Sequence, residues 1–218
     1  MTSSEKTSTK KLLGLTGAYC AGKNHIAKLL ERLGLPSLDL DKLGYEVLET
    51  EKARIVSRFG NDILADSGVI NRKLLGAKVF GKPLELAALE DIIHPEVNRK
   101  TLSWIEGQSG EACVINAALL HRSVAFTMLD AIIMVESPML TRLVRAKRRD
   151  HLPWLALLKR FHSQRSFLSQ YFSGNTDIYK VKNQRLFGSD NGVLTNKSDV
   201  QLNARLKEIL SCIGILVQ

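Results

Sequence analysis

The stretch that decides the fold is KLLGLTGAYCAGKNHIAKLLERL, residues 11–33. It begins with an apolar run at 11–17, passes through a glycine-rich segment, and continues with Ile26, Leu29 and Leu30 at helical spacing. Gly34 follows, and a glycine at that place commonly ends a helix. The pattern predicts a strand, a tight loop and an amphipathic helix.

Gly17 to Lys23 fit the phosphate-loop spacing G-x-x-x-x-G-K, and a strand before and a helix after are the context this motif requires. Backbone N–H groups of such a loop and the following helix N-terminus form a cradle for anions, and Lys23 can reach the outer phosphates. The sequence therefore predicts an ATP site, whose residues are Gly17, Ala18, Tyr19, Cys20, Ala21, Gly22, Lys23, Asn24 and His25.

The residue after the lysine is Asn24, where the motif has Ser or Thr. That hydroxyl normally ligates Mg²⁺. The Asn24 side chain offers a carbonyl oxygen, a ligand type that Mg²⁺ accepts in octahedral geometry. Asn24 is therefore the predicted metal ligand.

Further apolar segments alternate with helical patterns along the chain. We expect strands in PSLDLD (36–41), ACVINAAL (112–119), DAIIMVES (130–137) and VLTN (193–196). Such alternation indicates an α/β fold, with a parallel sheet flanked by helices.

One unit, 11–218, is expected after a disordered N-terminal tail at 1–10. Its sections are a core (11–52, 111–137 and 193–218), a helical substrate-binding insertion (53–110) in which Pro95 ends the last helix, a helical lid (138–169) and a polar loop insertion (170–192).

Charge and composition narrow the partners. The formal net charge is +9, and the excess lies mostly between 136 and 165, so an anionic partner is expected there unless the charges form only a solvated helix face. Aromatic content is 6% and no nucleic-acid-binding signature is present, which favours a phosphate-rich small molecule as the partner.

No secretory signal or spanning segment is seen, so we expect a cytoplasmic protein that does not bind membranes. The three cysteines suggest neither disulfides nor zinc.

Two acidic residues lie within the last part of the second predicted strand. Asp39 and Asp41 fall at its carboxyl end, where ligands of open α/β sheets collect. A carboxylate there can orient the proton of an attacking hydroxyl, and we expect this of Asp39. For Asp41 an N-cap of a helix starting at Lys42 is an equal alternative to substrate binding. Arg142, Arg145 and Arg149 are candidates for stabilising a transferring phosphoryl group.

Taken together, these segments resemble the dephospho-CoA kinase family. The loop GLTGAYCAGKN is similar to the family's G-L-T-G-G-x-x-x-G-K-S. More specific is RFGNDILADSGVINRKLLGAKVF followed by LEDIIHPEV, which resembles the family's F-G-x-x-I-L, G-x-x-x-R-x-x-L-x-x-x-V-F and L-E-x-I-x-H-P-x-V. The resemblance covers Lys11 to about Gln164 and resumes weakly at VLTN.

The resemblance implies transfer of the ATP γ-phosphoryl group to the 3'-hydroxyl of dephospho-coenzyme A with Mg²⁺. We expect a monomer or weak homo-oligomer without a nucleic-acid partner. By the same resemblance Asp39 matches the catalytic carboxylate, Lys23 the loop lysine, and Arg142 and Arg149 the lid arginines. The remaining carried-over residues are Asp41, Arg72, His94 and Leu119 for substrate binding, Asn196 for the adenine site, and Arg160 with Gln164 for the end of the lid.

The chain departs from the family pattern at AALLHR (117–122), where the family commonly has I-P-L-L-F-E. Ala118, His121 and Arg122 replace proline, an aromatic residue and an acid. Asn24 and Arg122 motivate one alternative, a catalytically impaired nucleotide-binding protein with a regulatory or interaction role. The positive charge motivates another, a basic nucleic-acid-binding protein.

Overall fold

The structure is a computed structural model that describes residues 10–163, 171, 176–184 and 197–217. The chain divides into two compact units. The first contains residues 1–37 and 108–218, and the second contains residues 38–107.

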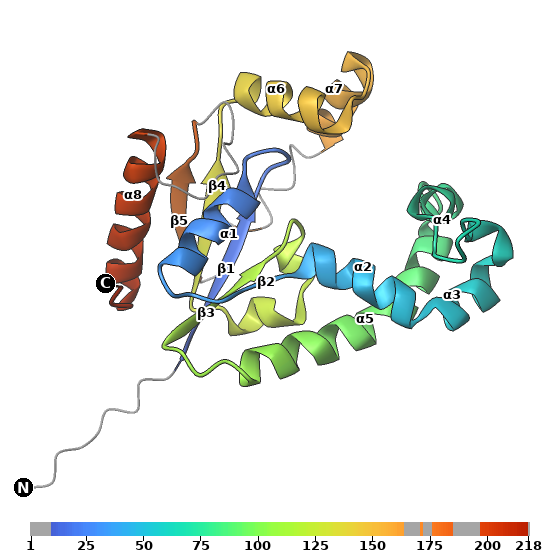
Figure 1. Ribbon diagram of the computed structural model, residues 1–218, viewed down its shortest axis with the longest axis horizontal. Helices are drawn as coiled ribbons and strands as arrows, with labels where there is room; N and C mark the ends of the chain where they lie inside the picture. The colour runs from blue at the N-terminus through green and yellow to red at the C-terminus, as the bar shows by residue number, and fades with distance from the viewer. Residues whose placement is uncertain (1–9, 164–170, 172–175, 185–196, 218) are drawn as a thin grey trace, which may run out of the picture. The chain divides into compact units, whose positions relative to one another are not determined.

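A five-stranded parallel sheet is the centre of the first unit (Figure 1). Its strands are β1 (Lys11–Gly17), β2 (Ser37–Asp39), β3 (Ala112–Asn116), β4 (Ala131–Glu136) and β5 (Asp177–Lys182), in the order β2-β3-β1-β4-β5. Strand β1 lies between β3 and β4, so both of its edges are paired, and all of its residues after Lys11 are buried, which explains its nearly continuous apolar sequence.

Two helices cover one face of this sheet. Residues of α1 (Lys23–Arg32) and α8 (Lys197–Ile213) share one buried cluster with alternate residues of the strands, among them Leu13 and Ile133. On the other face Gly14 lacks a Cβ atom, which would lie 2.6 Å from Leu120 and 2.7 Å from Leu129. The short 3₁₀ segments η2 (Leu120–Arg122) and η3 (Val124–Met128) belong to this side.

The predicted strand, loop and helix at 11–33 are confirmed. Helix α1 ends at Arg32, and Gly34 adopts a left-handed φ of 87°. The N–H of Gly34 donates to the Glu31 carbonyl and that of Leu35 to the Leu30 carbonyl, the two bonds of a Schellman motif. The glycine therefore stops the helix as predicted.

Two helices follow β4 within the first unit, α6 (Met139–Asp150) and α7 (Trp154–Ser163) (Figure 1). They correspond to the two basic helices expected in the lid. Their contact buries Ala146, Leu157 and Phe161, and the phosphate-loop residues Tyr19 and Cys20 pack against this small cluster. On the outside, Nζ of Lys147 lies 5.5 Å from the centre of the Trp154 ring, which is 53% exposed.

The second unit is helical, as expected of the insertion. It contains α2 (Leu40–Thr50), α3 (Lys52–Phe59), η1 (Asn61–Ile63), α4 (Arg72–Val79) and α5 (Pro83–Glu106) around a core of its own. Its boundary differs from the expected residue 53, because α2 packs against α5 and the unit begins at Leu38.

Pro95 does not end a helix, so that expectation was wrong. Helix α5 is 24 residues long and continues through Pro95. A proline inside a helix lacks one hydrogen bond and crowds the preceding turn, at a cost of about 3 kcal/mol. Leu89 before it and Ile105 after it are both buried, and burying two such side chains offsets a cost of that size.

The loop insertion expected at 170–192 was wrong for its middle part, because Asp177–Lys182 form strand β5. Val181 is fully buried and pairs with Val135, whereas Asp177, Lys180 and Lys182 are exposed. The sequence is polar because β5 is an edge strand. The strand expected at 193–196 lies outside the described residues.

Within the described part of the chain, no helix combines the length and apolar character needed to cross a membrane.

Candidate active site

The phosphate loop joins β1 to α1. Gly22 caps the helix with φ 93°, and Cys20 also has a positive φ of 58°. The N–H of Ala21 donates to the Ala18 carbonyl (2.8 Å), which closes a tight turn. Lys23 is the first helical residue, so it stands where the unpaired N–H groups of a helix and the positive end of its dipole favour an anion.

The arginines of α6 lie against this loop. Nε of Arg142 donates to the Tyr19 carbonyl (2.8 Å), and the guanidinium lies 4.7 Å from the centre of the Phe161 ring. Burial lowers the pKa of Arg142 from its usual value. Arg149 pairs with Asp150 (2.8 Å) and lies 5.0 Å from the centre of the Tyr19 ring.

Tyr19 connects the loop to both α6 and α7. Its hydroxyl donates to the Asp150 carboxylate at the end of α6, and its ring meets Phe161 of α7 edge to face, with centroids 5.4 Å apart. A bulky side chain in the phosphate loop thus ties the loop to α6 and α7.

Asn24 faces another carboxamide. Its Oδ1 accepts from Nδ2 of Asn116 (3.4 Å), the last residue of β3. Asn116 is 2% exposed, and its own Oδ1 has no hydrogen-bond partner. The described residues contain no cluster of three His, Cys, Asp or Glu side chains suited to a metal. Mg²⁺ at phosphates usually takes only one or two protein oxygens, so the two carboxamide oxygens fit it.

His25, predicted in the nucleotide site, pairs with a residue of α8. Its Nε2 lies 2.9 Å from Oδ1 of Asp199, a side chain that is only 5% exposed. This contact joins the first turn of α1 to the first turn of α8.

Asp39 is the last residue of β2 and the N-cap of α2. Its Oδ1 accepts from the N–H groups of Asp41 (3.0 Å) and Lys42 (3.2 Å). The cap is therefore Asp39 and not Asp41, which lies in the first helical turn. The strand stops at Asp39, so Asp39 and Asp41 do not lie on the same strand.

The other predicted substrate residues are accessible. Arg72 begins α4 and lies 4.3 Å from the centre of the Tyr45 ring, and His94 is exposed in the middle of α5. In the first unit Leu119 is 47% exposed. Gln164, Asn196 and the side chain of Arg160 lie outside the described residues.

Segment 117–122, which departs from the family pattern, contacts Tyr171 through His121. Tyr171 is 1% exposed, and its hydroxyl lies 3.2 Å from Nδ1 of His121 and 3.5 Å from the Thr16 hydroxyl. The two rings pack edge to face at 5.4 Å. Burial, and then the charge of Arg122, lower the pKa of His121 below its usual value.

This shift predicts a loss of stability in acid. Because the folded-state pKa of His121 is lower than the unfolded one of about 6.5, its contribution is present above that pH and is lost as the pH falls through the folded value. His121→Phe keeps the ring and removes the proton site, so we expect Tm to fall less between pH 7 and pH 5 than in the unmodified protein. Equal pH dependence in thermal melts of both proteins would contradict this.

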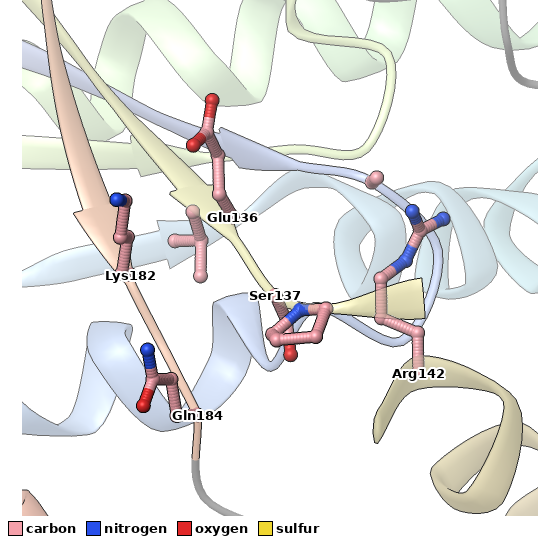
Figure 2. Close-up of a pocket in the computed structure, with 8 residues that line it drawn as sticks. Glu136, Ser137, Arg142, Lys182 and Gln184 are labelled. Carbon is pink, nitrogen blue, oxygen red and sulfur yellow. The ribbon is translucent and has the colours of Figure 1, made fainter. Parts of the chain in front are cut away.

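A cavity of about 420 Å³ borders the loop in the first unit (Figure 2). Arg142 reaches it from the start of α6, and Lys182 and Gln184 from the end of β5 (Figure 2). Ala18 also lines it. The volume is in the range of small-molecule sites. Lys182 and Gln184 were missed from the sequence because no motif surrounds them.

A parallel sheet, a glycine-capped loop after its central strand and a lysine at the start of the next helix define a phosphate-loop nucleotide-binding protein. The family model for dephospho-CoA kinase matches residues 11–173. The chain belongs to the dephospho-CoA kinase family, as its motifs suggested, and is an ATP-dependent phosphotransferase.

Relatives support this over most of the chain. A dephospho-CoA kinase of Halalkalibacterium halodurans is 34% identical over 165 residues, which are 73% of this chain and 82% of the relative. One from Dehalococcoides mccartyi is 29% identical over 213 residues, 95% of this chain and 96% of the relative.

Solved structures agree with the fold. The crystal structure of TT1252 from Thermus thermophilus has a TM-score of 0.73 at 25% identity and covers 93% of this chain and 97% of its own. A shikimate kinase from Bacteroides thetaiotaomicron, at 12% identity and a TM-score of 0.53, covers 92% of this chain and 98% of its own and shows the fold alone.

Proposed function

We propose that this chain transfers the γ-phosphoryl group of ATP to the 3'-hydroxyl of dephospho-coenzyme A. The new bond joins the 3'-oxygen to phosphorus, the bond from phosphorus to the β-phosphate oxygen breaks, and ADP leaves. The observation that carries the proposal is the anion cradle of Ala18 to Gly22, followed at once by Lys23, in a chain that matches the family model over 11–173.

Asp39 orients the attacking hydroxyl and takes its proton. Two N–H groups of α2 hold one of its oxygens, so the carboxylate is fixed before substrate arrives. Lys23 neutralises charge on the outer phosphates, and Arg142 and Arg149 of α6 stabilise charge on the transferring group.

Asn24 Oδ1 would hold Mg²⁺, which would supply further charge neutralisation at the phosphates when bound. The buried, unsatisfied Oδ1 of Asn116 beside it supports an oxygen-rich environment there. Dephospho-coenzyme A is bound by Asp41, Arg72, His94 and Leu119, for which their motifs and the exposure of the last three are the support.

Replacing Asn24 by serine tests the metal assignment. Serine restores the short hydroxyl usual at this place, so we expect kcat to be unchanged or raised and less magnesium to be needed. A magnesium titration of both proteins measures this. A fall in kcat of more than tenfold would show that the carboxamide has a role of its own.

The function itself is tested by coupled ADP release from ATP and Mg²⁺. We expect release with dephospho-coenzyme A and none with coenzyme A, whose 3'-hydroxyl is already phosphorylated. ATP binding without release would instead favour an impaired nucleotide-binding protein.

In the cell we propose a cytoplasmic enzyme that acts as a monomer or weak homo-oligomer and has no nucleic-acid partner. Its basic lid then serves the phosphates of its substrates. Salt-sensitive RNA or DNA retention on a filter, indifferent to ATP, would contradict this.

A further inference from the structure

Asn183, in a segment to which no motif assigns a role, contacts the phosphate loop at its backbone carbonyls. It follows β5, its N–H donates to the Glu136 carbonyl (2.7 Å), and it is 1% exposed. Its Nδ2 donates to the Ala21 carbonyl (3.0 Å). This buried carboxamide thus binds the loop backbone directly.

Arg145 of α6 shares this task. Its Nη1 donates to the carbonyls of Cys20 (3.1 Å) and Ala21 (2.9 Å), and its Nη2 donates to Oδ1 of Asn183 (3.2 Å). Together with Arg142 on the Tyr19 carbonyl, side chains hold three consecutive loop carbonyls. We call Arg145 and Asn183 the loop brace.

The brace determines where the loop N–H groups point. In a trans peptide the C=O and the following N–H lie on opposite sides. Arg142 holds the Tyr19 carbonyl and the loop brace holds the Ala21 carbonyl, which directs the N–H groups of Cys20 and Gly22 to the opposite sides of their peptides. Outward N–H groups are what an anion cradle requires.

The geometry also selects the residue type at 183. Asn183 must donate to a carbonyl and accept from Arg145, which an amide does and a carboxylate cannot. A Cβ atom at Gly22 would lie 2.2 Å from Asn183 Nδ2, so the glycine leaves room for this contact.

We propose that Arg145 and Asn183 are positioning residues that set the affinity for ATP by fixing the loop, without touching a phosphate themselves. This rests on the loop being the ATP site, as the proposed function has it. Arg145 consequently acts behind the loop, in contrast to the phosphate-stabilising role for which the sequence made it a candidate.

The test uses Asn183→Asp, which keeps the shape and sets an oxygen against the Ala21 carbonyl. We expect the Kd and KM for ATP to rise about tenfold, the size of one lost hydrogen bond, and the KM for dephospho-coenzyme A to stay within about twofold. The matched control is Asp177→Asn, the reciprocal change at the exposed start of the same strand, which we expect to leave both constants unchanged.

Arg145→Lys and Arg145→Met test the contribution of Arg145, the other residue of the loop brace. Lysine keeps one donor group, so it should restore part of the ATP affinity that methionine loses. In a double variant with Asn183→Asp the effects should be smaller than additive, because both residues hold the Ala21 carbonyl.

Calorimetric ATP titration and steady-state turnover of the full chain give the readouts. An ATP Kd within twofold of the unmodified protein in Asn183→Asp would overturn the inference. Additive losses of ATP affinity in the double variant would also overturn it. So would losses of affinity for both substrates that only follow the folded fraction in thermal melts. Failure of the proposed function is seen separately, as absent turnover in the unmodified protein.

Discussion

Replacing Asp39 by asparagine is expected to lower kcat by about 10²- to 10⁴-fold, the range for loss of a general base. Asparagine caps a helix about as well as aspartate. Its side-chain oxygen can keep the bonds to the N–H groups of Asp41 and Lys42, so the fold is retained while the proton acceptor is lost. Steady-state turnover and thermal melts measure the two effects.

Asp39→Ala is the matched comparison. It removes the cap as well, so it should cost about 0.5–2 kcal/mol of stability in addition to the same loss of turnover. If Asp39→Asn turned over within threefold of the unmodified protein, the carboxylate would serve only as a cap.

The second large effect is expected from Gly22→Ala. The added Cβ would lie 2.2 Å from Asn183 Nδ2, on a backbone with φ 93° that L-residues rarely adopt. Strain and overpacking together should cost about 2–5 kcal/mol. The loop brace must also shift, so we expect ATP affinity to fall by about 100-fold or more, as calorimetry would show.

Gly34→Ala separates the two causes. Gly34 has a similar φ of 87°, but a Cβ there meets no atom within 4 Å. It should cost only about 1 kcal/mol, with ATP affinity unchanged. Equal ATP affinities in the two variants would show that the contact with Asn183 is unimportant.

Local signals explain what the sequence could predict. The apolar run, the loop and the helix at 11–33 are specified by neighbouring residues, and a buried central strand such as β1 is mostly apolar. Strand β5 has no such signal, because an edge strand keeps polar residues and is held by pairing with β4. Pro95 misled for the same reason: burial on both sides of it is a tertiary effect.

The site residues also divide into those that the sequence predicts and those that only the fold brings together. Lys23 follows from a contiguous motif, whose spacing carries its geometry. The sequence indicated that α6 supplies arginines but not which side of the loop they meet, and Arg145 lies against the carbonyls. Asn183 is 162 positions from its partner Ala21, so only the fold brings them together.

The exposed indole of Trp154 on α7 gives the protein an optical reporter of its own. Lys147 lies over this ring, and a nearby ammonium changes the emission of an indole. The only other tryptophan is Trp104. Substituting Trp104 by phenylalanine leaves one tryptophan, Trp154 on α7, so rapid-mixing experiments can follow this helix as nucleotide is added without an attached dye.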